Sequence, residues 1–141
     1  MEMLVRECLR SAPVTVPPEC TLEEAAELMG RHGVGSLLVV TGDRLSGIVT
    51  DRDVAVRGIG TRKAPDSHVA AIMTPDPVTI QGSEDVFAAF RAFGAERVRR
   101  LPVLEDEELA GIISVDDLLV TLVLELGAVV SPVAQELLNP S

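Results

Sequence analysis

Apolar and polar positions near the N-terminus change from a strand-like to a helix-like pattern. A short β-rich run opens after a proline at residues 13–16. Thr21 and Glu24 then have the spacing of a capping box, in which two side chains satisfy backbone N–H groups at the start of a helix. Gly33 is a typical helix terminator. The apolar residues of the predicted helix recur on one face: Leu22, Ala25, Ala26, Leu28 and Met29.

Two more apolar runs follow this helix, at residues 36–40 and 45–49. Gly42 and Asp43 lie in the short connection between them, which favours a β-hairpin. The strands of the hairpin are almost continuously apolar, which predicts burial on both faces of a sheet. Because a last helix is expected to begin at Asp51, this half of the chain has the order β-α-β-β-α.

The second half of the chain repeats this pattern at one constant offset without a gap. The offset aligns residues 13–16 with 77–80, residues 47–50 with 111–114, and Asp53 with Asp117. The elements expected in the second copy are a helix from about Ser83, strands at 101–104 and 109–113, and a helix from Val115. Two copies of one supersecondary unit explain this register.

The repeat also predicts the domain organisation. The expected boundaries are a first repeat at residues 1–62, a second at 63–128 and a C-terminal tail at 129–141. A unit of about 60 residues buries only about 60% of the surface that its unfolded chain exposes. The two copies are therefore expected to share one core.

The last helix of the second copy carries a broad apolar stripe. Its members are Leu118, Leu119, Leu122, Val123 and Leu126. The stripe fits a core helix and a contact between subunits equally well, because large apolar patches mark interfaces. Beyond Gly127, Ser131 and Pro132 have the order of a cap followed by proline at the first helical position, which predicts a separate short helix to Leu138.

Composition narrows the classes of function. The 141 residues are 47% hydrophobic but include three Phe and no Trp or Tyr, so the core is aliphatic and aromatic stacking of nucleic-acid bases is excluded. A net charge of −10 has the wrong sign for a phosphate-backbone binder. No apolar run is long enough to span a membrane, and the charged first ten residues do not resemble a secretory signal, so a cytoplasmic protein is expected. Cys8 and Cys20 suit reduced packing thiols.

Each repeat places a hydroxyl and a carboxylate at the start of its last helix. These pairs are Thr50 with Asp53 and Ser114 with Asp117. Unpaired N–H groups and the helix dipole favour an anion there, and a carboxylate can accept hydrogen bonds from a vicinal diol. The nearby arginines that could pair with phosphate are Arg52, Arg97, Arg99 and Arg100. The same spacing is also that of a helix cap without a ligand, and the arginines also suit a solvated strand edge.

The pattern Gly, two aliphatics, Ser/Thr, two free positions and Asp, together with Arg-Leu-Pro-Val at residues 100–103, resembles a tandem pair of cystathionine-β-synthase (CBS) domains, the Bateman module. The resemblance covers about residues 3–126. It implies an α/β (α+β) fold in which two β-α-β-β-α repeats pack with pseudo-twofold symmetry through their sheets. It leaves no room for an attached catalytic domain.

The resemblance also implies two clefts that bind adenosine nucleotides. In this family the Asp of the motif bonds the ribose hydroxyls, the Ser/Thr reaches phosphate, and backbone of the early Val-Thr strand contacts the base. No metal ligand is implied. The nucleotide-binding residues that it implies here are Thr15, Val16, Thr50, Arg52, Asp53, Thr79, Ile80, Arg99, Arg100, Ser114 and Asp117.

The resulting hypothesis is a free-standing regulatory protein without an obligatory cofactor. It binds AMP, ADP or ATP, or else S-adenosylmethionine, forms a homodimer, and signals occupancy to an unidentified protein. The alternative is a ligand-free interaction or dimerisation scaffold of the same fold. Catalysis is not expected, because His32 and His68 suggest no catalytic arrangement and no Gly-rich phosphate loop occurs. The clefts should be chemically unequal, because Gly35-Ser36 aligns with Arg99-Arg100.

Overall fold

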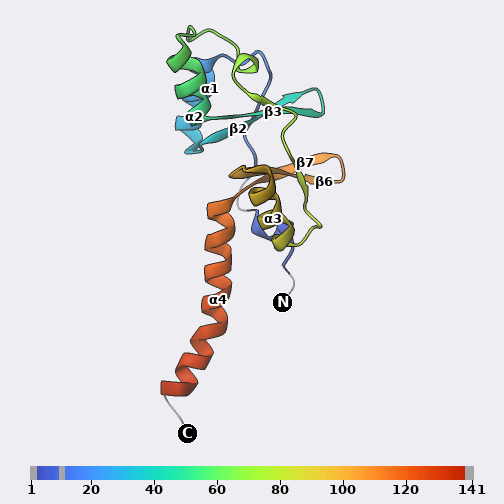
Figure 1. The fold of residues 1–141 in the computed structure, drawn as a ribbon, viewed down its shortest axis with the longest axis vertical. Coiled ribbons are helices and arrows are strands. Elements are labelled where there is room, and N and C mark those ends of the chain that lie inside the picture. Colours follow the sequence, from blue (N-terminus) through green and yellow to red (C-terminus); the bar gives the residue numbers. More distant parts are fainter. Residues whose placement is uncertain (1–2, 10–11, 139–141) are drawn as a thin grey trace.

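The two repeats pack through their sheets, and their helices lie on the outer sides (Figure 1). The computed structural model describes residues 3–9 and 12–138, without the side chains of five positions late in the last helix. The arrangement that the resemblance implies, two α+β repeats packed with pseudo-twofold symmetry through their sheets, is confirmed. Within this described part of the chain, no helix combines the length and the apolar character needed to cross a bilayer.

The first repeat contributes most of a four-stranded sheet with the order β1-β2-β3-β4. Its elements are β1 (Thr15–Val16), α1 (Leu22–His32), β2 (Ser36–Thr41), β3 (Arg44–Thr50) and α2 (Asp51–Asp53), which continues as a π-helical segment (Val54–Gly58). β1 runs parallel to β2, and the β2–β3 hairpin is antiparallel. The Thr21–Glu24 capping box is present, and Gly33 ends α1 in the left-handed conformation (φ 63°), as the pattern predicts.

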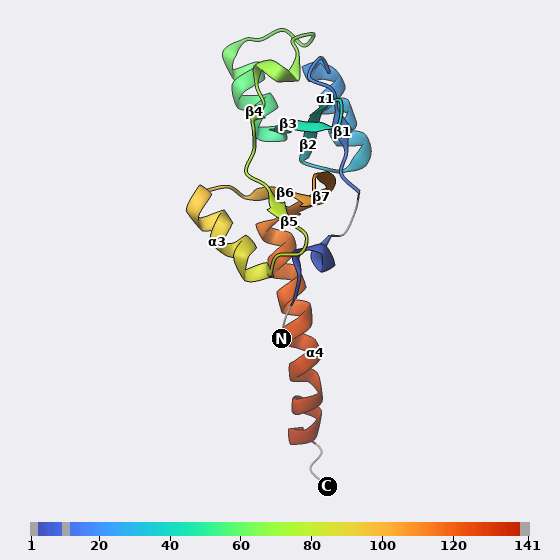
Figure 2. The ribbon, with the colours of Figure 1, turned by 90° about the vertical axis from the view of Figure 1, so that its right-hand side faces the viewer.

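The second repeat forms a three-stranded sheet with the order β5-β6-β7. Its elements are β5 (Ile80–Gln81), α3 (Val86–Glu96), β6 (Arg100–Glu105), β7 (Glu108–Ser114) and α4 (Val115–Leu138). The two hairpins have the same register, so Ser36 pairs with Thr50 and Arg100 pairs with Ser114. β4 (Thr74–Pro75) lies in the connection between the repeats and pairs with β3 (Figure 2). The β-α-β-β-α order is confirmed in both copies.

Two predicted helix boundaries in the second half are wrong. α3 begins at Val86 rather than near Ser83, because Asp85 occupies the position of Thr21 and caps the helix, its carboxylate accepting from the Phe87 N–H at 2.8 Å. α4 is one helix of 24 residues, with Pro132 inside it, instead of a helix and a separate tail. A proline removes one backbone donor, and this loss alone does not end the helix.

The burial of the hairpin strands also differs from the prediction. β2 and β6 each bury three consecutive residues, as expected for a strand covered on both faces. β3 and β7 instead alternate between more and less buried positions. β2 and β6 are therefore covered on both faces, and their hairpin partners β3 and β7 are covered mainly on one.

The described buried residues form two cores rather than the single shared core that was expected. Each core nevertheless takes side chains from both halves of the sequence. Val5 and Cys8 pack in the core of the second repeat, whereas Val69 and Ile72 pack in that of the first. The segment that precedes each repeat therefore packs in the core of the other repeat, and these exchanged segments bury apolar surface that one repeat alone would leave exposed.

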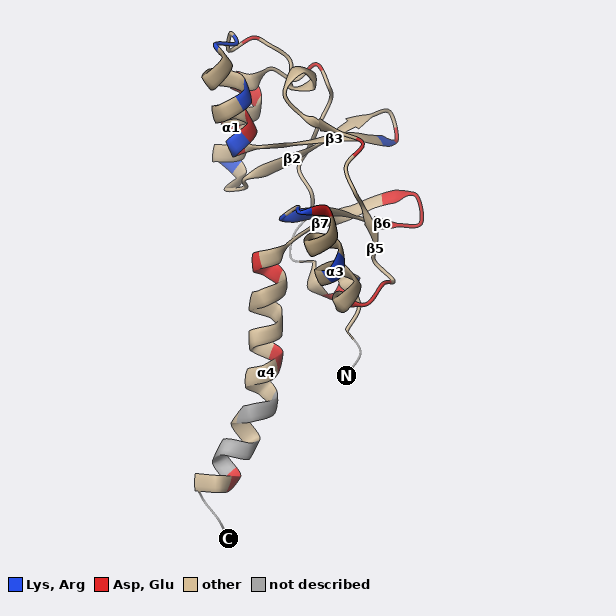
Figure 3. Cartoon of the chain, in the orientation of Figure 1, with Lys and Arg blue, Asp and Glu red and all other residues tan. Residues whose placement is uncertain are grey.

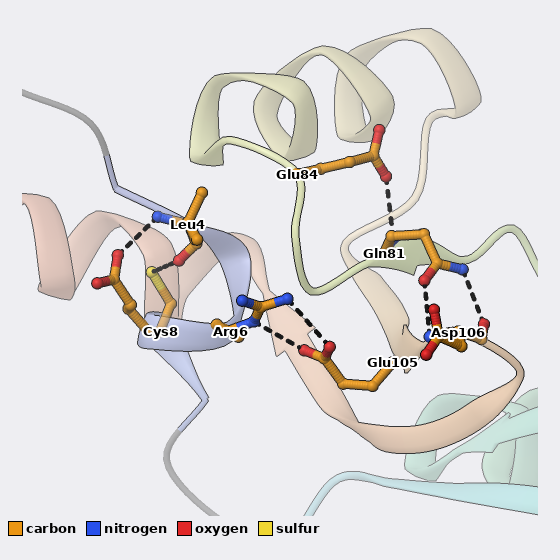
Figure 4. A network of polar contacts seen from close by, with 8 residues as sticks. Leu4, Arg6, Cys8, Gln81, Glu84, Glu105 and Asp106 are labelled. Atoms are coloured by element: carbon orange, nitrogen blue, oxygen red, sulfur yellow. Dashed lines mark hydrogen bonds and ion pairs between the residues drawn. The ribbon is translucent and has the colours of Figure 1, made fainter.

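The exchanged segments dock through equivalent hydrogen bonds. The Val5 N–H donates to the Glu84 carbonyl at 2.8 Å, and the Val69 N–H donates to the Cys20 carbonyl at 2.8 Å. The segment at the N-terminus is also held by the Arg6 guanidinium, which donates two bonds of 3.1 Å to Glu105 (Figure 4).

The glycine that opens each motif makes room for an exchanged segment. A Cβ on Gly47 would collide with the Met73 sulfur, and a Cβ on Gly111 would lie 2.9 Å from Leu9 Cδ2. Close packing against these two residues therefore explains why glycine occurs at both motif positions.

Candidate functional site

At each motif a cleft lies between the repeats. The Ser114 cleft has a volume of about 340 Å³ and the Thr50 cleft about 270 Å³. Both are lined by residues from the two repeats, and most of their lining positions correspond through the sequence offset. The clefts are therefore pseudo-equivalent sites with different side chains.

The Ser114 cleft is bounded on one side by residues 33–36, where the first repeat turns from α1 into β2. The other side is formed by the end of β7 and the start of α4, with Ile112, Ser114 and Asp117. Val34 and Ile112 supply apolar surface, and the other named side chains supply polar groups. This combination is typical of small-molecule sites.

The Thr50 cleft combines the first motif with the connection between the repeats. Thr50 and Asp53 lie at the end of β3 and the start of α2. Val78 from the connection and Val98 from the second repeat form the apolar part. This cleft is smaller than the usual range for small-molecule sites, which begins at about 300 Å³.

At the first motif the Asp53 carboxylate is already engaged. The Thr50 N–H donates to Asp53 Oδ2 at 2.9 Å, and the Asp53 N–H donates to Thr50 Oγ1 at 3.1 Å. Arg57 Nε lies 3.7 Å from Asp53 Oδ1, and the Asp53 side chain is 16% exposed. The helix-cap interpretation therefore describes this motif well.

At the second motif the carboxylate is unengaged. The Asp117 N–H donates to Ser114 Oγ at 3.0 Å, which reproduces half of the capping box. Within the described part of the chain, the Asp117 carboxylate accepts no hydrogen bond and forms no ion pair. It lines the Ser114 cleft with its acceptor oxygens available to a ligand.

Arg99 and Arg100 line both clefts. Arg99 Nη2 lies 3.5 Å from Asp116 Oδ1 at an exposed position. Figure 3 shows a basic segment at the start of β6 and an acidic segment at the start of α4. Arg100 reaches across to the first repeat, because a Cβ on Gly35 would lie 3.0 Å from Arg100 Nη2 and 3.3 Å from Asp51 Oδ2. A side chain at position 35 would therefore be in tight contact with this guanidinium, which would have to shift.

Six of the eleven predicted nucleotide-binding residues line a cleft. They are Thr50, Asp53, Arg99, Arg100, Ser114 and Asp117.

The other five predicted residues line neither of these two clefts. Val16 and Ile80 are buried in the two cores, because β1 and β5 pair with the covered strands β2 and β6. Thr15 and Arg52 are exposed, and Thr79 lies in a separate acidic hollow near Asp43.

The sequence did not indicate which apolar residues line the clefts. Val34, Val78 and Val98 line them, and the repeat alignment already pairs Val34 with Val98. Aliphatic side chains carry no chemical signature, so the alignment could not separate them from core residues.

The two cysteines lie outside the clefts and are buried in the two cores. Burial raises the pKa of the Cys20 thiol, and the nearby Glu24 carboxylate raises it further by its charge and a hydrogen bond. Cys8 and Cys20 are both buried without a disulfide, which confirms the prediction of reduced packing thiols. Among the described residues, no three His, Cys, Asp or Glu side chains are grouped to hold a metal ion.

Comparisons with known proteins agree with this architecture. The chain is 32% identical over 116 residues to the CBS domain-containing protein YhcV of Bacillus subtilis. The aligned residues cover 82% of this chain and 83% of that protein. The crystal structure of the CBS domain NE2398 matches with a TM-score of 0.80 and 26% identity, over 87% of this chain and 99% of that one.

A third similar protein was solved with a nucleotide. The CBS domain protein PAE2072 from Pyrobaculum aerophilum, complexed with AMP, has a TM-score of 0.75 and 24% identity, over 82% of this chain and 89% of that one. This level of identity shows a common fold. The family model of the CBS domain matches residues 5–58 and 69–124. The chain therefore belongs to the CBS domain family, as a tandem pair of CBS domains.

Proposed function

We propose that this CBS pair is a regulatory binding module that takes an adenosine nucleotide of the AMP, ADP and ATP class in the Ser114 cleft. The observation that carries the proposal is the unengaged carboxylate of Asp117, which lines a cleft that also holds Arg100. A carboxylate without a protein partner can accept both hydroxyls of a ribose. The nearby guanidinium can pair with phosphate.

The surroundings of Asp117 support this choice of cleft. α4 is a regular helix of 24 residues whose N-terminus favours an anion beside Ser114. α2 at the Thr50 cleft spans three residues before it becomes a π-helical segment, so its dipole is shorter and less regular. The fold is also shared with PAE2072, which was solved with AMP.

The proposed role is regulatory rather than catalytic. Among the described residues that line the two clefts there is no His, Cys or Lys to act as a base or nucleophile. His32 is the last residue of α1, and His68 lies in the connection between the repeats. Occupancy would be read by a protein partner.

Thermal melting and calorimetric titration test the proposal directly. The ligands are AMP, ADP, ATP, adenosine and S-adenosylmethionine, each titrated to millimolar concentration. A ligand at 100 times its Kd stabilises the native state by about 2.7 kcal/mol, which raises the melting temperature by several degrees. No shift with any of these compounds would refute nucleotide binding and favour the ligand-free scaffold.

We also propose that the module forms a homodimer through α4, which projects from the body (Figure 1). Leu118 is buried against the chain's own core, whereas Leu119, Val123 and Leu126 are 49%, 66% and 62% exposed. The stripe therefore divides into a core edge and an outward apolar face. A twofold contact between two such faces would bury this surface.

A further inference from the structure

Among the described residues, two cations line the clefts, and one of them, Arg100, has no acidic partner. Arg99 and Arg100 line both clefts, and the equivalent positions in the first repeat are the uncharged Gly35 and Ser36. The pseudo-symmetry of the fold thus supplies two clefts, but the sequence supplies their shared arginines from one repeat.

Three other arginines near the clefts are paired with acids. Arg57 lies 3.7 Å from Asp53, and Arg44 lies 3.4 Å from Asp76, so both acids of the Thr50 cleft have partners. Arg99 lies 3.5 Å from Asp116.

Arg100 is different from these three arginines. Within the part of the chain that the structure describes, its guanidinium forms no ion pair and donates no hydrogen bond. The side chain is partly buried, crosses to Gly35, and passes near Asp51 without pairing with it. A partly buried guanidinium without a partner is well suited to bind an anionic ligand.

We propose that Arg100 is a phosphate ligand shared by the Ser114 and Thr50 clefts, so that their phosphorylated ligands compete for it. A phosphate bound in one cleft withdraws this cation from the other cleft and adds a negative charge close to it. The second phosphorylated ligand therefore binds more weakly, whereas an uncharged nucleoside leaves the second cleft unaffected. This inference rests on the proposed function, because it takes the ligands to be nucleotides.

The sharing of Arg100 is tested by measuring how Arg100→Ala changes AMP binding in each of the two clefts. Val34 lines the Ser114 cleft and Val78 the Thr50 cleft, so their methyl signals in NMR titrations report the occupancy of each cleft separately. We expect Arg100→Ala to weaken AMP about tenfold at both clefts and to change adenosine less than about twofold, since a charge-assisted bond is lost with the phosphate alone.

Arg52→Ala is the matched control for this substitution. Arg52 is an exposed arginine next to the first motif that lines neither cleft, so its loss should leave AMP binding unchanged at both. A loss confined to one cleft in Arg100→Ala would show that the arginine serves that cleft alone, and it would overturn the proposal. An equal loss in Arg52→Ala would assign the effect to overall charge and also overturn it.

The competition is tested by emptying one cleft. In Asp117→Asn the Ser114 cleft should no longer fill at AMP concentrations that fill the Thr50 cleft. AMP should then bind the Thr50 cleft at least about fivefold more tightly than in the wild type, at the low end of common coupling strengths. Adenosine should bind there as in the wild type. Asp116→Asn removes the same charge from the lining of the Ser114 cleft but keeps the Asp117 carboxylate, so a Ser114 cleft that still fills with AMP in this variant excludes a simple charge effect.

Failure of the proposed function can be distinguished from failure of this inference. If AMP shifts neither valine in the wild type, nucleotide binding is refuted. Pyrophosphate then tests the shared arginine by itself. We expect it to shift Val34 and Val78 together and to lose both effects in Arg100→Ala. No shift with pyrophosphate, or a shift at one valine, would overturn the inference.

Discussion

Asp117→Asn should separate ligand binding from helix capping at the second motif. The substitution keeps the shape of the side chain and removes its charge. Because the Asp117 carboxylate has no partner among the described residues, the free energy of unfolding should fall only by the loss of a charge at a helix N-terminus, about 0.3–1 kcal/mol. For a chain of this size the melting temperature should drop by at most about 4 °C.

The same substitution should weaken AMP strongly in the Ser114 cleft. Asparagine presents one acceptor and one donor, so it cannot accept from both ribose hydroxyls. The loss of charge-assisted bonds costs about 1.5–3 kcal/mol of binding free energy, which is a ten- to hundredfold rise in Kd.

Asp53→Asn should lower the stability of the protein more than its affinity for AMP. Its carboxylate accepts from the Thr50 N–H at 2.9 Å and lies 3.7 Å from Arg57. Loss of these contacts should lower the free energy of unfolding by about 1–2 kcal/mol. AMP should bind the Ser114 cleft within about twofold of the wild-type affinity.

Asp116→Asn controls for the change in charge. It removes a carboxylate next to Asp117 and releases Arg99 from its 3.5 Å ion pair, so AMP should bind as in the wild type or more tightly. Calorimetric titration of the three variants, each with its melting curve, is the assay. If Asp117→Asn binds AMP like the wild type but melts lower, its carboxylate is a helix cap and the proposed ribose contact is wrong.

Three other predictions concern assembly, packing and thiol chemistry. Sedimentation of the wild type should give a mass of about twice the 15.0 kDa of one chain, and the double variant Leu119→Glu/Val123→Glu should be a folded monomer. A wild type that is monomeric at all concentrations would contradict the α4 dimer. Val5 is near the N-terminus, but its side chain is fully buried in the core of the second repeat, so Val5→Ala should lower the free energy of unfolding, measured in urea, by about 2 kcal/mol. A decrease below about 0.5 kcal/mol, the usual limit for surface sites, would contradict this docking. Cys8 and Cys20 should react with dithiobis(nitrobenzoate) only on unfolding, and the raised pKa of Cys20 keeps its thiolate scarce at neutral pH; rapid native labelling would show that they are accessible.

The amino-acid sequence by itself determined the repeated unit and the positions of the two motifs. The register of the copies, the hairpins and the first capping box depend on local spacing, and the structure has them where the pattern predicts them. Propensities and caps act within a few residues, so they can be read from one segment at a time.

Tertiary structure decided what each of these local features does. The same Ser/Thr-x-x-Asp spacing makes a complete capping box at Asp53 and leaves the carboxylate of Asp117 unengaged. The exchange of Val5 and Val69 between the cores, and the position of Arg100 at both clefts, depend on how the repeats pack. Contacts between residues far apart in the sequence leave no periodic signal in it. Only the packing of the two repeats could therefore show which motif is free to bind a ligand.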